Sequence, residues 1–276
     1  MIAACLKWVD QRPEADALGL PAEPDARFGG VSAADQAALE WALRCSGPGG
    51  DDVLAITVGP SQADGVLRDA LAAGATRAVR IDVPFGAPSR VVAACLAAHL
   101  GGASLVWCGD ASFDRGTGSV PAFLADELGY PQALGLVAVD LASGSAADGV
   151  RFDVLRRLDG GRRERLAISG PTVLSVEGST AMLRRAPLRA LLGRHEIEVA
   201  CATAVAIGET SGAGVSRPYR PRPRALAPPS GETALDRVKE LLAPVASGAR
   251  GELAVLPPAE AAERILSALR DWGYLP

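Results

Sequence analysis

Residues 105–119 read L-V-W-C-G-D-A-S-F-D-R-G-T-G-S, a short apolar run that leads into a loop of polar residues and glycines. The apolar part, 105–108, predicts a buried strand because turn residues bound it. Apolar residues then recur at the spacing of one helix face: Val120, Phe123, Leu124 and Leu128. The stretch therefore predicts a strand, a glycine loop and a helix start that meet at one point.

The start of that helix has the chemistry of an anion site. The first backbone N–H groups of a helix lack intrahelical partners, and the helix dipole favours negative charge there. Gly116 and Gly118 would let the backbone come close to a ligand, while Thr117 and Ser119 add hydroxyl donors. The loop indicates a site for a nucleotide phosphate, and an ordinary strand-to-helix turn explains the same residues equally well. It matches neither G-x-G-x-x-G nor G-x-x-x-x-G-K-[ST], which argues against a dehydrogenase dinucleotide site or a P-loop.

The first hundred residues alternate strands and helices in the same way. Strands are expected at residues 2–9, 53–58 and 78–81. Helices are expected to begin at Ser32-Ala-Ala-Asp35 and Ser61-Gln-Ala-Asp64, which both have capping-box form, and a third covers about 91–100. Alternation of this kind predicts parallel strands, right-handed crossovers and ligands at the carboxyl ends of the strands. The loop after residue 108 lies at such an end.

The second half of the chain has a different pattern. Strands are expected at residues 134–141, 151–158, 165–168 and 172–176, with an antiparallel hairpin at Asp159-Gly160-Gly161. The arginine-rich segment 181–195 is either a basic helix or an irregular arm. Residues 209–232 are rich in Pro, Gly and Arg, so they form a flexible linker or an extended arm laid on a partner. Amphipathic helices are expected after Thr233 and over about 258–272.

Length and composition narrow the class of protein. A chain of 276 residues allows one large domain, alone or with an extension. The net charge of −4 gives no basic surface for nucleic acid. No apolar run reaches the length of a membrane span, and Met1 leads into an apolar segment without a signal-peptide pattern, so a cytoplasmic location is expected.

Cysteine, histidine and charged residues offer few candidates for catalysis. Five cysteines without a C-x-x-C pair predict buried thiols rather than disulfides or a zinc site, and only His99 and His195 are present. No Ser/His/Asp or Cys/His arrangement suggests itself. Lys7 either faces the crevice and neutralises ligand charge or is a solvated surface lysine. Asp114 is expected to be a turn or cap residue rather than a base.

Seven short stretches carry a family resemblance through their order and spacing. They are Cys5-Leu-Lys7, Ser32-Ala-Ala-Asp35 with Ala38-Leu39-Glu40, Val58-Gly59-Pro60, residues 67–75 (L-R-D-A-L-A-A-G-A), residues 114–119 (D-R-G-T-G-S), Leu128-Gly-Tyr-Pro-Gln132 and Leu158-Asp-Gly-Gly161. Over roughly the first two-thirds of the chain they resemble the β subunit of electron transfer flavoproteins, a family that also contains nitrogen-fixation-associated homologues. A divergent branch associated with mycofactocin redox metabolism is the subtype that the chain resembles.

The resemblance implies a fold, a ligand and a partner. The fold is α/β, with a mostly parallel, doubly wound sheet of the adenine-nucleotide-hydrolase type, an antiparallel portion and a C-terminal extended arm. The β subunit of that family has no catalytic group of its own. It binds AMP, or a second FAD in bifurcating types, and pairs with an α subunit that holds the electron-carrying FAD. The resemblance places the nucleotide at Cys5, Ser32, Ala33, Ala34, Asp35, Val58, Gly109, Asp110, Asp114, Gly116, Thr117, Gly118 and Ser119.

The chain also departs from the family pattern. The family usually has Asn-Pro at Ser32-Ala33, an acidic residue at Gly116 and Gln at Ser119, so the phosphate contacts are rearranged and AMP and FAD both stay open. The family's recognition loop, L-P-A-V followed by N-E-P-R-Y, is only loosely matched at 170–174 and 182–185. Unusual partner dehydrogenases are therefore expected.

The resulting hypothesis is a non-catalytic subunit of a heterodimeric flavin electron carrier. Residues 1–208 would be its nucleotide-binding α/β domain, and residues 209–276 a linker and a helical, partner-binding arm. The first alternative is an adenine-nucleotide-binding regulatory module. The second is a small hydrolase that uses Asp110 or Asp114 as its base.

Overall fold

The computed structural model describes residues 1–12, 25–46, 50–141, 151–202, 228–229, 232–242 and 254–275. Met1–Tyr219 and Arg220–Pro276 are two separate units, and each is considered by itself. The domain boundary expected between residues 208 and 209 lies outside the described residues, as does most of the 209–232 segment.

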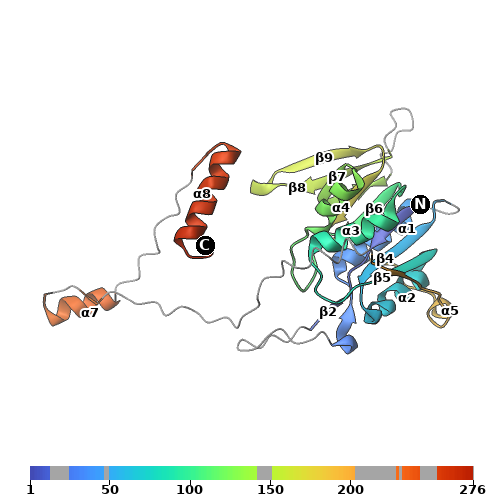
Figure 1. Ribbon diagram of the computed structural model, residues 1–276, viewed down its shortest axis with the longest axis horizontal. Coiled ribbons are helices and arrows are strands. Elements are labelled where there is room, and N and C mark those ends of the chain that lie inside the picture. The colour runs from blue at the N-terminus through green and yellow to red at the C-terminus, as the bar shows by residue number, and fades with distance from the viewer. Residues whose placement is uncertain are drawn as a thin grey trace. The chain divides into compact units, whose positions relative to one another are not determined.

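A mixed sheet organises the first unit (Figure 1). Its described strands, in spatial order, are β11 (Glu198–Cys201), β5 (Arg77–Asp82), β4 (Val53–Gly59), β1 (Ile2–Cys5), β6 (Leu105–Gly109), β10 (Thr172–Val176), β7 (Gln132–Asp140), β8 (Phe152–Arg157) and β9 (Arg163–Ile168). Every pair from β11 to β7 is parallel, and β7, β8 and β9 pair antiparallel. The predicted α/β class, with a mostly parallel sheet and an antiparallel portion, is confirmed.

Helices cover both faces of the sheet because strand residues alternate in direction. In β1, Ile2 and Ala4 pack in a core with α1 (Ala33–Ser46) and α2 (Asp64–Ala73). Ala3 and Cys5 pack in a second core with α3 (Ser89–Leu100) and α4 (Val120–Leu128). This is the doubly wound arrangement, and it leaves the carboxyl ends of the parallel strands open for a ligand.

The first strand is shorter than the sequence predicts. It ends at Cys5, and a separate strand, β2 (Val9–Asp10), pairs antiparallel with β3 (Gly29–Gly30) after the short 3₁₀ helix η1 (Ala26–Phe28). The backbone N–H of Lys7 donates to the Asp35 carboxylate, so the chain turns out of the sheet at this point. A side chain from α1 therefore binds the backbone just past the end of β1.

Two further local predictions need correction, and one open alternative is decided. Ser61 does not cap α2, because Ser61–Ala63 forms the 3₁₀ helix η2 and α2 begins at Asp64 without a side-chain cap. Phe123 does not pack inward and is 40% exposed. In the arginine-rich segment 181–195 only α5 (Leu188–Leu191) is helical, so most of this segment is irregular.

The second unit contains α7 (Ala234–Leu242) and α8 (Pro258–Asp271), close to where the sequence predicts helices. The Thr233 hydroxyl accepts the backbone N–H of Asp236 at 3.2 Å, which confirms the expected cap. Apolar side chains of both helices are exposed: Leu235, Val238, Leu241, Leu242, Ile265 and Trp272. In the part of the chain that the structure describes, no helix is both long and apolar enough to cross a bilayer.

Candidate functional site

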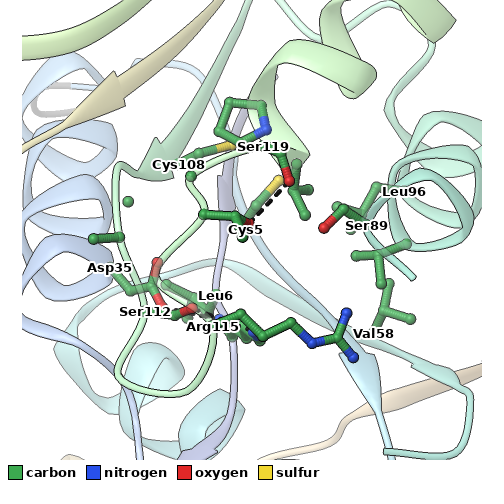
Figure 2. A pocket seen from close by; sticks show the side chains of 18 of the residues that line it. Cys5, Leu6, Asp35, Val58, Ser89, Leu96, Cys108, Ser112, Arg115 and Ser119 are labelled. Atoms are coloured by element: carbon green, nitrogen blue, oxygen red, sulfur yellow. Dashed lines mark hydrogen bonds between the residues drawn. The ribbon is translucent and has the colours of Figure 1, made fainter. Parts of the chain in front are cut away.

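A cleft lies at the carboxyl ends of β1, β4 and β6, between α1 on one side and α3 and α4 on the other (Figure 2). It encloses about 760 Å³ with the open solvent at its mouth included. Seven of the residues expected from the sequence line it: Cys5, Asp35, Val58, Gly109, Thr117, Gly118 and Ser119. Residues separated by more than a hundred positions therefore meet where the topology predicts a ligand.

The loop before α4 forms one wall of the cleft and depends on its glycines. Gly116 and Gly118 have φ of +61° and +57°, a conformation that other residues rarely adopt. A Cβ on Gly118 would also lie 2.3 Å from the carbonyl oxygen of Asp110. Any larger residue at 118 must therefore move the loop.

This loop presents donors to the cleft. The Thr117 and Ser119 hydroxyl oxygens lie 3.0 Å apart and both residues line the cleft, as Figure 2 shows for Ser119. Ser119 precedes α4 and makes no side-chain cap bond to it, so its hydroxyl is directed elsewhere. Hydroxyl groups beside the positive end of a helix dipole suit a phosphate.

The opposite wall is apolar, and of its residues only Val58 was expected from the sequence. Val58 from β4 and Leu96 from α3 lie across the cleft from Asp35 and Cys108 (Figure 2). Ala87 and Val92 extend the same surface. The helical pattern of α3 predicted its buried residues, but only the crossing of α3 over the strand ends brings them to the cleft.

Asp35 lies at the floor of the cleft and is buried. Burial raises the pKa of its carboxyl to about 7, although backbone hydrogen bonds from Lys7 and Gly109 and the charge of Lys7 oppose this shift. Its own backbone N–H donates to the Ser32 hydroxyl at 3.1 Å, so Ser32 caps α1 as predicted. A Cβ on Gly109 would lie 2.4 Å from Oδ1 of Asp35, which explains why glycine stands there.

Lys7 lines the cleft, as one of its two predicted roles requires. Its Nζ donates to the Asp114 carboxylate at 2.6 Å and 2.7 Å and to the Ser112 hydroxyl at 3.2 Å. Burial acts to raise the pKa of Asp114, but the hydrogen bonds from Lys7 and Ser112 outweigh it and hold the pKa at about 2. Asp114 thus orders the loop, in keeping with its prediction as a turn residue.

Sequence comparisons agree with this architecture. A family model described as "Electron transfer flavoprotein domain" matches residues 25–208. The "Electron transfer flavoprotein subunit beta" of Chromohalobacter salexigens is 33% identical over 215 residues, 75% of each chain. The protein of the same description from Methylophilus methylotrophus is 28% identical over 179 residues, 63% of this chain and 66% of its own. The chain belongs to the electron transfer flavoprotein β-subunit family.

Another relative carries a different description. The "Acryloyl-CoA reductase electron transfer subunit gamma" of Anaerotignum propionicum is 33% identical over 105 residues, 36% of this chain and 39% of its own. Its name, like those of the β subunits, describes a subunit that transfers electrons. An electron transfer flavoprotein role therefore follows for this chain, and the family implies association with flavin.

Six residues expected at the family's nucleotide site do not line the cleft: Ser32, Ala33, Ala34, Asp110, Asp114 and Gly116. Ser32 is buried and its hydroxyl accepts the backbone N–H of Asp35. Ala33 lies so close to Gly178 that a Cβ on Gly178 would be 2.8 Å from the Cβ of Ala33. Burial and then the charge of Glu177 raise the pKa of Asp110. These residues support the cleft from behind or beside it.

The cysteines take no part in cross-linking. All five are free; Cys5, Cys95 and Cys108 are buried as predicted, whereas Cys201 is exposed. Cys5 on β1 and Cys108 on β6 are register partners. A hydrogen bond with Cys5, together with burial, raises the pKa of the Cys108 thiol well above its ordinary value. Within the described ranges, no group of three or more His, Cys, Asp or Glu residues could hold a metal ion.

Proposed function

We propose that this chain is the β subunit of a heterodimeric electron transfer flavoprotein and binds AMP in the cleft beside α4. The observation that carries the proposal is that the cleft has a wall of hydrogen-bond donors and, facing it, an apolar wall. Thr117 and Ser119 offer hydroxyls beside the start of α4, and Val58, Val92 and Leu96 form an apolar surface opposite. A nucleoside monophosphate has a matching pair of ends, an anionic phosphate and a flat, largely apolar base.

The charges of the site suit binding rather than hydrolysis. A general base needs a pKa near the working pH. Asp114 has a pKa of about 2 and is engaged by Lys7, so it is a poor proton acceptor. Asp110 lies outside the lining of the cleft. Neither of the two aspartates that the hydrolase alternative names therefore suits the role of base, and we propose a subunit that is not catalytic alone.

The same residues fit the adenylate end of FAD, which is the second ligand that the family resemblance implies. FAD, mainly held by the α subunit, supplies the redox chemistry of the carrier when bound. The residues of this chain then bind, orient and exclude water. We propose that electrons pass from flavin-dependent dehydrogenases to a downstream acceptor, and that the complex is cytoplasmic.

The C-terminal unit is proposed to bind the α subunit. Its helices expose apolar residues along their length, among them Leu241 on α7 and Trp272 at the end of α8. An apolar helix face of this kind is usually covered in the working assembly. Residues 209–276 would therefore be a partner-binding arm, and residues 1–208 the nucleotide-binding domain.

Purification with and without a co-expressed α subunit tests the proposal. A yellow heterodimer that releases AMP on denaturation, identified by mass spectrometry, is the expected result. Thr117→Val should weaken AMP binding by about 1 kcal/mol, because it removes one hydroxyl donor without changing the shape. Thr57→Val is the matched control, since its hydroxyl is buried in β4 without a hydrogen-bond partner among the described residues. A colourless chain that hydrolyses nucleotides by itself would contradict the proposal.

A further inference from the structure

Arg115 stands between the nucleotide cleft and a second cavity. It lines both, and so do Lys7, Val58, Ala87 and Val92. The second cavity is smaller than the cleft and measures about 380 Å³ with the open solvent at its mouth included. The two spaces therefore share a boundary, and the side chain of Arg115 is part of it.

The guanidinium of Arg115 bridges two segments of the chain. Nη1 donates to the carbonyl oxygen of Ala87 at 3.2 Å, and Nη2 donates to that of Gly86. Figure 2 shows the side chain reaching across the cleft toward Val58, away from Ser119. The loop before α4 is thus fastened to the loop before α3 at the end of the cleft that lies opposite the phosphate donors.

The space beyond this bridge differs from the cleft itself. It is lined by Trp8 and Phe85, whose rings meet edge to face at a centroid distance of 5.9 Å. Phe85 is 44% exposed although it is a large apolar residue. Trp8 is buried, so the exposed ring of Phe85 is the aromatic surface against which a flat ring of a ligand longer than a mononucleotide would pack.

We propose that Arg115 is a specificity-determining residue that limits the site to mononucleotides. This inference rests on the proposed nucleotide function. With the guanidinium held on Gly86 and Ala87, the cleft ends at the bridge and accepts AMP. A longer adenylate ligand must break both charge-assisted hydrogen bonds before it can enter the second cavity, and this cost lowers its affinity relative to AMP.

Arg115 could instead attract the second phosphate of a longer ligand, and the two roles predict opposite changes in affinity when Arg115 is removed. The full chain, co-purified with its α subunit and dialysed free of loosely bound nucleotide, is titrated with AMP and with ADP-ribose, which is AMP extended by a phosphate and a ribose. If Arg115 excludes long ligands, Arg115→Ala shifts the affinity ratio at least tenfold toward ADP-ribose, about 1.4 kcal/mol. If Arg115 binds phosphate, the same variant shifts the ratio toward AMP, and the inference is overturned.

Two further variants sharpen the result. Arg115→Lys keeps the charge but cannot hold two carbonyl groups with one planar fork, so it should shift the ratio in the same direction as Arg115→Ala. Arg162→Ala is the matched control, because Arg162 is also exposed and donates to a backbone carbonyl, that of Asp159, in the turn between β8 and β9. It should leave both affinities unchanged.

A measurement without ligand tests the bridge itself. Hydrogen exchange of residues 83–88 should quicken in Arg115→Ala and not in Arg162→Ala. Unchanged exchange, or AMP binding with an unchanged ratio in Arg115→Ala, overturns the role of Arg115 and leaves the proposed function standing. A parent protein that binds neither nucleotide contradicts the proposed function and this inference with it.

Discussion

Lys7 and Asp114 are separated by 107 positions in the sequence, and Nζ of Lys7 lies 2.6 Å from Oδ2 of Asp114. Lys7 follows β1, and Asp114 belongs to the loop before α4, so the ion pair joins the centre of the sheet to the wall of the cleft. The side chain of Lys7 is 40% exposed and that of Asp114 20%. The pair therefore lies at the edge of the cleft, partly screened by water.

Lys7→Met should loosen this loop. Asp114 has a folded pKa of about 2, below its ordinary 3.8, so its ion pair stabilises the protein above that ordinary value and ceases to do so as the pH falls through about 2. We expect a loss of about 1 kcal/mol at neutral pH, allowing for partial exposure. Urea unfolding measures the loss, and NMR titration should show the Asp114 pKa rising toward 3.8.

The control for this variant is Lys239→Met, which alters the other lysine of the sequence, on an exposed position of α7. It should change neither stability nor the Asp114 titration. If Lys7→Met is as stable as the parent and Asp114 still titrates near 2, the ion pair does not order the loop.

Gly118→Ala should disrupt the cleft far more than Gly160→Ala, although both glycines have a positive φ. Gly118 and Gly160 both have positive φ, +57° and +69°, so alanine is strained at each by about 1–2 kcal/mol. Only at 118 would the new Cβ meet a backbone atom, the Asp110 carbonyl oxygen at 2.3 Å. Nucleotide binding should be lost in Gly118→Ala and kept in Gly160→Ala, as calorimetry would measure. Equal effects of both replacements would mean that strain alone matters.

Asp35 should make the free energy of unfolding decrease as the pH rises toward neutral. Its folded pKa of about 7 exceeds its ordinary 3.8, so the folded chain holds a proton that the unfolded chain releases between these values. The contribution to stability is complete below 3.8 and is lost as the pH rises through about 7, on the order of a few kcal/mol. Urea unfolding across this range, compared between the parent and Asp35→Asn, isolates it. Parallel stability profiles of the two proteins would contradict the raised pKa.

Removal of residues 209–276 should leave the nucleotide-binding core folded and abolish stable pairing with the α subunit. A milder test is Ile265→Asp, which places a charge among the exposed apolar residues of α8, with Glu263→Gln on the same helix as the control. Only Ile265→Asp should weaken co-purification with the α subunit. If the truncated chain still pairs at full strength, or if its core unfolds, the arm has another role.

The order of the elements could be predicted from the sequence because its cause is local. Apolar runs between turn residues predicted β4, β5 and β6, and the apolar spacing predicted α3 and α4. Ser32 and Thr233 predicted the starts of two helices, because a capping side chain binds a backbone N–H only three residues away. The structure confirms both caps. The glycine loop before α4 was visible for the same reason, since positive φ values require glycine where no other residue fits.

The order of the strands within the sheet could not be predicted from local sequence patterns. β10 follows β9 in the chain but lies between β6 and β7, parallel to both. A short run such as Thr172–Val176 pairs equally well with many edges in isolation. Its place depends on burying all five residues at once, and that burial is decided by the packing of the whole sheet.

The sequence by itself determined the class of fold, the glycine loop and the capped helix starts, because backbone conformation and amphipathic spacing act over a few residues. Only the tertiary structure decided which groups surround the cleft. The ion pair of Lys7 and Asp114, the apolar wall from α3 and the bridge from Arg115 to Gly86 and Ala87 join segments far apart in the chain. Such contacts form only after the strands are ordered, so no local pattern records them.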